Sequence, residues 1–572
     1  MKASNLKSVT VAAAMFVSSA FGGAAMAQSA DMILTNGKII TQDENSSIAA
    51  ALGIRDGNIA AVGTDDAIKK LAGSKTVKVD LGGRTVIPGL IDSHTHSIRS
   101  ALTFAVETDW SDIKTLDEGL KIIAAAARAK PGAWIVVAGG WHEGQIKEQR
   151  GPTSVELAKA APDNPVYVQH LYDYAVLNPK GMELLDIGSD AKLPPAGKLV
   201  RDGENRLTGV VRGNLVTFNQ LFARVSNTTF EGKVESTKAF FKALNRVGLT
   251  GIVDAAGGGM APQDYEPLFR VAEQKRLSIR VGFYLNSIIA GKEAANLKEI
   301  VGIVPSKFAD DKLTFIGLGE VLVWGMHDGP AGLLKTFTPK PGATDTLREI
   351  AVWAAEGKRR LQIHASSDSA AGQILDIFEE VNSKVPIGDL RWIIAHIENA
   401  TPQTFQRMKK LGMGWAVQDR LYFEGDVWPR VMGNDAATQA PPISEGIKAG
   451  LIVAGGTDGP RLAPYNPFVT LEWLVTGKTV KGTSIRSKQY SATREQALRI
   501  HTFNSAWMAG DENKRGTLEP GKWADLVVLS DDYLTVPENN ISKIKALMTI
   551  VGGKVEHATG PFTEIGGSAQ SK

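Results

Sequence analysis

A short apolar stretch that ends in two histidines constrains this chain most. It reads Ile87-Pro88-Gly89-Leu90-Ile91-Asp92-Ser93-His94-Thr95-His96. Side chains of a strand alternate between its two faces, so His94 and His96 can present two imidazoles to one ion from a rigid element. A His-x-His pair by itself is as compatible with a surface strand as with a metal site. The preceding Pro-Gly, Asp92 and matching sites downstream favour the metal site.

Eight short apolar segments follow one another in an order typical of a barrel. Most are followed by loop residues and a helical pattern, as in a parallel sheet. They are Val86–Ile91, Gly251–Asp254, Ile279–Leu285, Leu313–Val323, Leu361–Ala365, Trp392–Ala395, Gly414–Val417 and Leu451–Ala454. The first two lie far apart, and connections inside a barrel are short, so we expect an inserted substructure at about 97–242. The pattern predicts an α/β fold of the TIM type, a (β/α)8 barrel over 87–509.

Both ends of the chain read as short strands joined by turns. Asp56-Gly57 and Gly552-Gly553 are turn signals, each between two apolar runs. The final Gly, Ser, Gln and Lys residues indicate a disordered tail over 561–572. A chain of 572 residues is long enough for a large barrel with an accessory domain.

The first residues read as an export signal. Lys2 and Lys7 give a short basic start, Val9–Ala20 is mostly small and apolar, and Ala25-Met26-Ala27 offers a cleavage site before Gln28. The alternative, a membrane anchor, is weaker because the apolar run is short and interrupted by serines. We therefore expect a signal peptide over 1–27 and a soluble periplasmic or secreted mature protein that is not attached to a membrane.

Composition narrows the partners further. The net charge of +3 is small for this length and no dense basic block is present, so nucleic-acid binding is not indicated. The absence of cysteine fits an oxidising compartment and excludes disulfides and thiolate ligands. We expect a small-molecule substrate, and the pattern leaves a homo-oligomer open.

Polar side chains stand at the carboxyl ends of several expected strands. His364 follows Leu361-Gln362-Ile363, His396 follows Trp392-Ile393-Ile394-Ala395, and Asp458 follows the run Val453–Gly456 by two residues. Active sites of barrels assemble at that end of the strands. Four histidines and an acid in barrel order favour a metal site over a set of unrelated boundary residues.

These motifs resemble the amidohydrolase 3 (YtcJ-like) branch of the amidohydrolase superfamily. The resemblance runs from Asp31 to about His557 and rests on PGLIDSHTH, the LQIHA run and the AGGTDGP turn. It implies a barrel beside a small β-sandwich built from both chain ends, 28–86 and 510–560. It also implies the ligand set: His94 and His96 on one metal, His364 and His396 on a second, and Asp458 on the first metal and the attacking hydroxide. Imidazoles and carboxylates suit zinc, about two ions per chain, with manganese, iron and cobalt left open.

Glu320 is a departure from the pattern of much of that family. The family carries a carboxylated lysine on the fourth strand, and this chain has Glu320 in the run Phe315–Val321. A glutamate is already a carboxylate and can bridge two metals, although its reach is shorter. The alternative is that Glu320 is an ordinary strand acid and that the site holds one metal.

The expected function is hydrolysis of an amide-type carbon–nitrogen bond other than a peptide bond. A metal-bound hydroxide would attack the carbonyl carbon, with Asp458 as general base and then as general acid. An ester or carbamate hydrolase on the same site is one alternative. A non-catalytic periplasmic binding or regulatory protein is another, which the complete set of candidate ligands disfavours.

Three further histidines are candidates for contact with substrate. His327 follows the fourth strand, and a structural role in its loop is about as compatible with the sequence. His170 lies in the insertion, where the related proteins keep substrate contacts. They usually show Gly-His near this point, whereas this chain has Tyr172-Asp173 in that register. His142, beside Trp141, is equally compatible with a wall of the pocket and with a packed polar residue.

Overall fold

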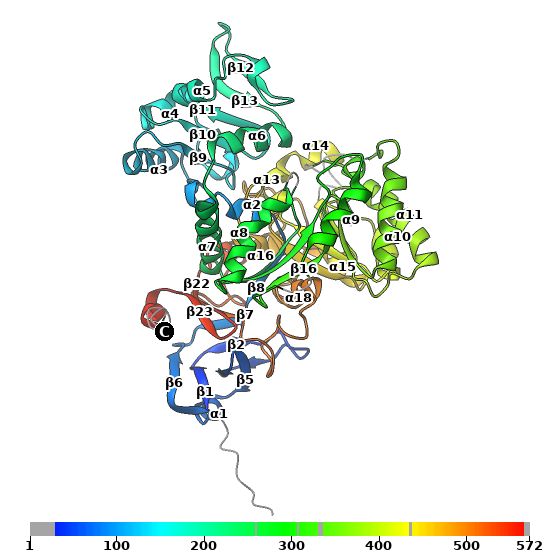
Figure 1. Ribbon diagram of the computed structural model, residues 1–572. Coiled ribbons are helices and arrows are strands. Elements are labelled where there is room, and N and C mark those ends of the chain that lie inside the picture. The colour runs from blue at the N-terminus through cyan, green and yellow to red at the C-terminus, as the bar shows by residue number, and fades with distance from the viewer. Residues whose placement is uncertain (1–28, 258–259, 306–307, 330–335, 434–437, 566–572) are drawn as a thin grey trace, which may run out of the picture.

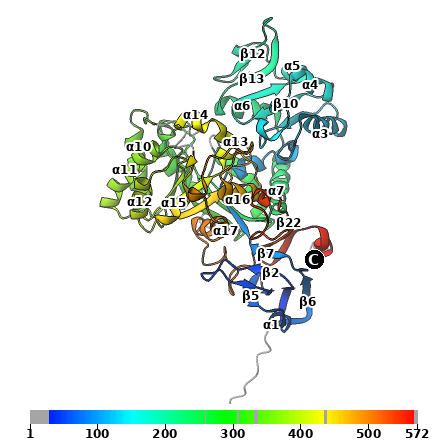
Figure 2. The ribbon, with the colours of Figure 1, turned by 180° about the vertical axis from the view of Figure 1, so that it is seen from behind.

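The computed structural model describes residues 29–257, 260–305, 308–329, 336–433 and 438–565. Three parts follow one another along the molecule: a β-sandwich at one end, a barrel with its helices in the middle, and an inserted unit at the other end (Figure 1). The same order is visible from behind (Figure 2). The expected signal peptide, 1–27, lies outside the described residues. Of the helices in the described ranges, none combines the length and the apolar character that a bilayer span needs.

The barrel is an eight-stranded sheet in which all neighbouring strands are parallel. Its strands follow chain order, and the Ser93 hydroxyl donates to the Gly455 carbonyl at 2.8 Å between the first and last of them. Most of their residues are buried, as in strands covered on both faces. The expected TIM-type barrel is confirmed. The strands are β8 Leu90–Thr95, β14 Leu249–Asp254, β15 Arg280–Leu285, β16 Leu313–Leu318, β17 Arg360–Ala365, β18 Ile393–His396, β19 Gly414–Gln418 and β20 Ile452–Gly456.

Helices follow these strands and cover the outside of the barrel (Figure 1). Several begin at a side-chain cap, such as Ser367 before α11 and Thr401 before α12, which satisfies a free backbone N–H. Their apolar faces and the outer faces of the strands share one large core. The helices are α2 Ser97–Ala101, α7 Phe230–Arg246, α8 Glu266–Glu273, α9 Glu293–Ile303, α10 Ala343–Glu356, α11 Asp368–Lys384, α12 Pro402–Lys410, α13 Arg420–Glu424, α14 Trp428–Met432, α15 Ile443–Lys448, α16 Pro467–Thr476, α17 Arg494–Ile500 and α18 Phe503–Ala509.

The first expected barrel strand, Val86–Ile91, is in fact the junction of two strands. β7 (Thr85–Pro88) belongs to the β-sandwich, and the barrel strand β8 starts at Leu90. Gly89 separates them at a close approach, because a Cβ there would lie 2.1 Å from the Thr250 hydroxyl oxygen. Both strands are buried, so the sequence shows one continuous apolar run and does not indicate that the chain passes from one sheet to the other.

The β-sandwich is built from both ends of the chain, as expected. β21 of the C-terminal segment pairs antiparallel with β7, and the two sheets share a buried core. One sheet has the order β5, β4, β1, β6 and the other β23, β22, β21, β7, β2, β3. Their strands are β1 Ala30–Thr35, β2 Lys38–Ile40, β3 Ile48–Ala49, β4 Ala51–Arg55, β5 Asn58–Gly63, β6 Ala72–Asp80, β7, β21 Leu526–Leu529, β22 Ala546–Val551 and β23 Lys554–Ala558, with helix α1 Asp65–Lys69 beside them.

Regular structure continues into the segment expected to be a disordered tail, 561–572. A short 3-10 helix covers Gly560–Phe562, and the Phe562 side chain is buried in the sandwich core with the Arg84 guanidinium over its ring. The sequence signal came from the polar residues further on, and 566–572 lie outside the described residues.

Between β8 and β14 the chain forms a second sheet with apolar clusters on it. Arg461, on the loop after β20, holds this unit to the barrel. Its guanidinium donates two 2.7 Å hydrogen bonds to the Glu107 carboxylate, and its backbone carbonyl accepts one from the Gly140 N–H. The sheet has the order β12, β13, β11, β10, β9. Its elements are α3 Leu116–Ala129, β9 Ile135–Val137, α4 Ser154–Ala160, β10 Val166–His170, β11 Tyr174–Leu177, α5 Pro179–Leu184, β12 Lys198–Arg201, β13 Leu207–Arg212 and α6 Leu215–Val225.

Candidate metal centre

The six expected ligands stand at the carboxyl end of the barrel. His94 lies on β8, with His96 directly after that strand, His364 lies on β17 and His396 ends β18. Glu320 follows β16 by two residues and Asp458 follows β20 by two. Parallel strands bring these ends to one mouth, and the ligand atoms converge there.

Two groups of three side chains could each hold a metal ion. In each group the candidate ligand atoms lie within 4.8 Å of one another, and every side chain is buried. The first group is His94, His96 and Glu320, and the second is Glu320, His364 and His396. Glu320 is common to both groups.

The Glu320 carboxylate lies among the four imidazoles. Its Oε1 is 3.4 Å from His96 Nε2. Its Oε2 is 3.3 Å from His94 Nε2, 3.4 Å from His364 Nδ1 and 3.5 Å from His396 Nε2. Oε1 therefore lies beside His96 and Oε2 beside the other three histidines, so one carboxylate contacts both pairs.

The backbone brings this shorter side chain into place. The expected strand Leu313–Val323 ends at Leu318, and the following loop is held by hydrogen bonds from Gly319 N–H to the Leu285 carbonyl and from Glu320 N–H to the Ala255 carbonyl. A Cβ on Gly319 would lie 1.9 Å from the Gln362 carbonyl oxygen, and its φ is +142°. Glycine at this position allows the loop to lie directly against β17.

Unsatisfied buried nitrogens fit a cation at this place. Both ring nitrogens of His94 and Nδ1 of His396 are buried and make no hydrogen bond within the described residues, although His94 Nε2 lies at ion-pair distance from Glu320. Leaving such atoms unpaired costs about 1–3 kcal/mol each. His96, in contrast, has Nδ1 against the Ala256 carbonyl, which leaves Nε2 for an ion. A ring nitrogen held in this way is typical of metal-binding histidines.

The charges of the group are strongly coupled. Burial opposes charge on His96 and His364, yet Asp458 and Glu320 raise the pKa of His96 to about 9, and Asp328 and Glu320 raise the pKa of His364 to about 10. Burial also opposes charge on Glu320 and Asp458, which would raise their carboxyl pKa values. The neighbouring histidines outweigh it and hold both pKa values well below their usual range. The acids are therefore ionised, and a cation among them would displace protons from the two rings.

Asp458 is placed beside the first group rather than within it. Its Oδ1 is 3.0 Å from His96 Nε2 and 3.8 Å from His94 Nε2, and its Oδ2 is 3.8 Å from Arg420 Nε. The Asp458 N–H donates to the His94 carbonyl at 3.0 Å. The carboxylate is thus fixed to the strand that carries the first two histidines, with one oxygen toward them.

A narrow cavity of about 50 Å³ lies over this group. His327 lines it and stacks on His364, with ring centroids 4.0 Å apart, while burial and the charge of His364 lower the pKa of His327 to about 3. The His327 ring is therefore neutral at physiological pH. The lining residues are His96, Arg99, Tyr172, Leu215, Glu320, Val321, Trp324, His327, His364, His396, Arg420, Asp458 and Leu462.

His170 and His142 do not line this cavity in the described part of the chain. They pack against each other and into an aromatic cluster, His142 stacked on Phe423 and His170 on Tyr174. Tyr172 occupies the place expected for a histidine of the insertion, because β10 ends at His170 and the turn that follows carries Tyr172 to the cavity. The described structure therefore places His170 and His142 in this cluster and not on the cavity wall, and their contact with substrate stays a prediction.

Sequence reasoning also missed Arg99 and Arg420. Arg99 lies three residues after His96 on α2, and Arg420 follows the end of β19 by two residues. The strand-end rule used for the histidines would have found Arg420, since it applies to every barrel strand.

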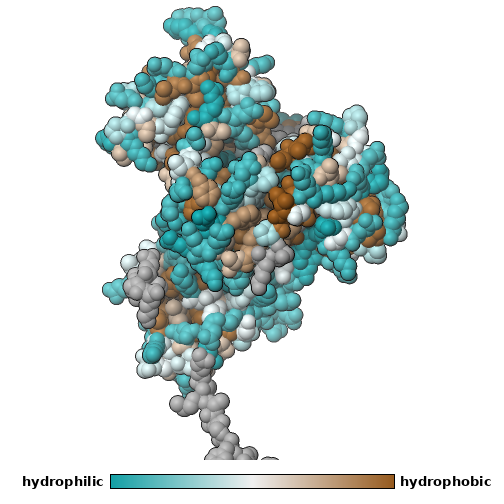
Figure 3. Space-filling view, in the orientation of Figure 1, coloured by the Kyte–Doolittle hydropathy of each residue, from teal (hydrophilic) through white to brown (hydrophobic). Residues whose placement is uncertain are grey.

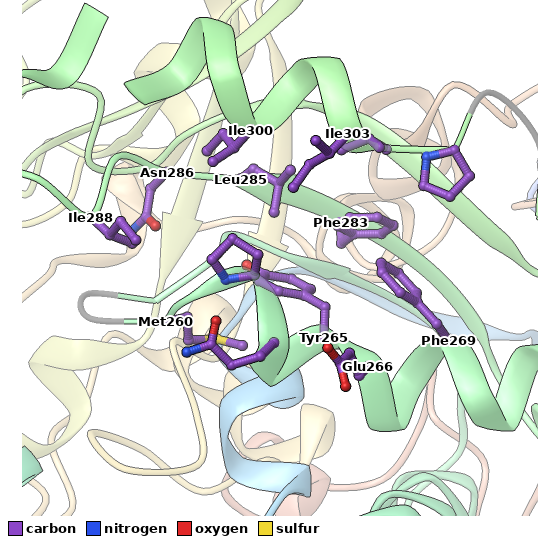
Figure 4. A pocket seen from close by; sticks show the side chains of 14 residues that line it. Met260, Tyr265, Glu266, Phe269, Phe283, Leu285, Asn286, Ile288, Ile300 and Ile303 are labelled. Carbon is purple, nitrogen blue, oxygen red and sulfur yellow. The ribbon is translucent and has the colours of Figure 1, made fainter. Parts of the chain in front are cut away.

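A larger cavity, about 330 Å³, lies elsewhere, between α8, α9 and the outer face of β15 (Figure 4). Its walls are mostly apolar, with Tyr265, Phe269, Phe283 and Ile300 pointing into it. Ile303, at its edge, is 66% exposed, and apolar residues gather on this face of the barrel (Figure 3). Among the described residues it holds no group of potential metal ligands, so the chemistry belongs to the narrower cavity.

Comparison with known proteins agrees with this geometry. Residues 78–557 match the model of the amidohydrolase family, Amidohydro_3, and the chain belongs to that family. It is 26% identical over 549 residues to an N-substituted formamide deformylase of Arthrobacter pascens, covering 93% of this chain and 99% of the relative. It is 22% identical over 537 residues to the amidohydrolase homologue YtcJ of Bacillus subtilis (strain 168), covering 91% and 98%.

A solved structure shares the fold over nearly the whole chain. An uncharacterized metal-dependent hydrolase from Pyrococcus furiosus superposes with a TM-score of 0.63 and 21% identity, covering 88% of this chain and 100% of that one. The protein is therefore a metal-dependent hydrolase of the amidohydrolase family that acts on carbon–nitrogen bonds other than peptide bonds.

Proposed function

We propose that this protein is an exported amidohydrolase that cleaves a non-peptide amide of the N-formyl or N-acyl type. The observation that carries the proposal is the pair of three-ligand groups that share Glu320, with Asp458 beside one of them. The likeness to an N-substituted formamide deformylase over almost the whole of both chains supports this substrate class.

The residues divide into two holding sets. His94, His96 and Glu320 would hold one divalent ion, and Glu320, His364 and His396 a second, with Asp458 completing the first set. Nitrogen and carboxylate ligands of this kind suit zinc. When bound, such ions acidify water and polarise a carbonyl oxygen.

Asp458 moves the proton in the proposed reaction. Its buried Oδ1 accepts a proton from the attacking water and then delivers it to the leaving nitrogen, so that formate or another carboxylic acid and a free amine are released. Arg420 lies 3.8 Å from Oδ2, and its charge favours the ionised carboxylate that must accept the proton. The buried walls, among them Val321, exclude bulk water.

The experiment is turnover of a panel of formamides, acetamides, cyclic amides and esters by the purified mature protein. We expect hydrolysis of amides, loss of it after chelation and recovery with zinc. A protein that binds zinc stoichiometrically and turns over no member of the panel would contradict the proposed function. Turnover of the esters alone would show that the protein is an ester hydrolase and not an amide hydrolase.

The proposed periplasmic or secreted location rests on the first 27 residues of the sequence. Expression of the full chain in a Gram-negative host, cell fractionation and N-terminal sequencing test it. We expect a periplasmic protein that begins at Gln28. A cytoplasmic protein that retains its first residues would contradict this location.

A further inference from the structure

Two arginines reach the cavity, and their surroundings differ. Arg420 is buried among carboxylates: its guanidinium nitrogens lie 3.6 Å from Glu398 Oε1, 3.6 Å from Glu424 Oε2 and 3.8 Å from Asp458 Oδ2. Acids of the protein therefore lie at ion-pair distance from its charge, although its Nε and Nη2 make no hydrogen bond within the described residues.

Arg99 has no such balance. Within the described ranges no carboxylate lies at ion-pair distance from it, and its guanidinium makes one side-chain hydrogen bond, from Nη2 to the Tyr172 hydroxyl oxygen at 3.1 Å. The nearby acid, Asp254, already accepts from the backbone N–H groups of Ile98 and Ala256. Arg99 is thus a half-buried cation on the wall of this cavity, and within the described residues its guanidinium has one hydrogen-bond partner among five N–H donors.

Arg99 lies close to the metal centre. It stands on α2, three residues after His96, and both side chains line the same cavity, together with Asp458. A group bound by Arg99 would therefore lie close to the first ligand set.

Tyr172 adds a second donor from a different part of the chain. It comes from the turn after β10 in the insertion, and its hydroxyl accepts from Arg99, which leaves its own proton free to donate. A guanidinium fork beside a hydroxyl fits an acceptor with two oxygens, such as a carboxylate. Trp324, Leu215 and Leu462 provide apolar wall for the remainder of a substrate.

We propose that Arg99 and Tyr172 bind a carboxylate of the substrate, so that the enzyme acts on amides that carry a carboxylate close to the scissile bond. The inference rests on the proposed amidohydrolase function and names its substrate class. The insertion then takes part in choosing the substrate, since it supplies Tyr172.

The test compares two substrates that differ by the carboxylate: N-benzylformamide and para-(formamidomethyl)benzoate. We expect wild type to favour the benzoate in kcat/KM. Arg99→Leu should reduce that ratio by about 10- to 100-fold, mainly through KM, because hydrogen bonds to charged groups contribute at about this level. Arg99→Lys should retain part of the preference and Tyr172→Phe should reduce it less. Arg206→Leu, at an exposed turn of the insertion, is the matched control and should leave the ratio unchanged.

A binding measurement separates the two proposals. Titration calorimetry of the zinc-loaded protein with the product para-(aminomethyl)benzoate, against benzylamine, reports recognition of the carboxylate without turnover. The site is supported if Arg99→Leu binds para-(aminomethyl)benzoate more weakly than wild type does, while the two proteins bind benzylamine equally. Equal binding and an unchanged substrate ratio in Arg99→Leu overturn it and leave the amidohydrolase function standing. If wild type turns over neither substrate and no member of the amide and ester panel, the amidohydrolase function is overturned instead, and calorimetry then decides on the carboxylate site.

Discussion

Removal of the Glu320 carboxylate is the most direct test of the shared centre. Glu320 is common to both candidate groups, so Glu320→Ala leaves two imidazoles in the second group and two imidazoles beside Asp458 in the first. We expect the zinc content to fall from about two ions per chain toward one or none. At a free zinc concentration of 100 times Kd, each filled site stabilises the fold by about 2.7 kcal/mol, so the loss should also lower the free energy of unfolding in zinc.

The assay is elemental analysis of zinc-reconstituted protein after removal of free metal, with urea unfolding of the same samples. Glu320→Gln keeps the volume and removes the charge, and it should resemble Glu320→Ala. Glu356→Ala, at an exposed position on α10, is the control and should match wild type. One ion in both wild type and Glu320→Ala, or two in both, would refute the bridge and require a different mechanism.

Three other substitutions test the remaining parts of the structure. Asp458→Asn should lower kcat in steady-state kinetics by about two to four orders of magnitude while the second ligand set stays intact. An activity near that of wild type would exclude Asp458 as the proton carrier. Gly319→Ala places a Cβ 1.9 Å from a carbonyl oxygen of β17, so we expect a loss of about 3 kcal/mol in urea unfolding and a lower zinc content. Gly372→Ala, with open space around its Cβ in α11, should be stabilising or neutral. Arg461→Leu breaks a buried ion pair and should lower the free energy of unfolding in urea by about 3–5 kcal/mol. Arg150→Leu, at an exposed pair, should lower it by less than about 1 kcal/mol. Equal losses would show that burial does not decide the contribution of these pairs.

The barrel could be predicted from sequence because its strands are short, apolar and in chain order. The same rule located the candidate ligands, because polar residues at the ends of buried parallel strands meet at one mouth of the barrel. His364 and His396, which are 32 positions apart in the sequence, have ring centroids 4.5 Å apart for this reason. The run around Gly89 was harder to divide, since an apolar pattern does not show which sheet a strand joins.

The insertion was the part that sequence could not place. Its local pattern indicates strands and helices, but which of its side chains meets the barrel depends on how the two units pack. His170 and Tyr172 are two residues apart, and a turn between them sends one into an aromatic cluster and the other to the cavity. Arg99 was missed for a related reason: a charged residue on a short helix is ordinarily solvated, and its place on the cavity wall is a property of the tertiary structure.

The β-sandwich has a consequence for the order in which the molecule can be assembled. β7 pairs with β2 on one side and with β21, from the far end of the chain, on the other. A growing chain on the ribosome therefore carries β7 with one open edge until its last strands have been synthesised, and open edges invite pairing with other chains. Because β7 continues through Gly89 into β8, the strand that holds His94 and leads into His96 has its N-terminal neighbour fully paired only at the completion of the chain. Truncation before Leu526 would leave an aggregation-prone edge directly beneath an otherwise complete barrel.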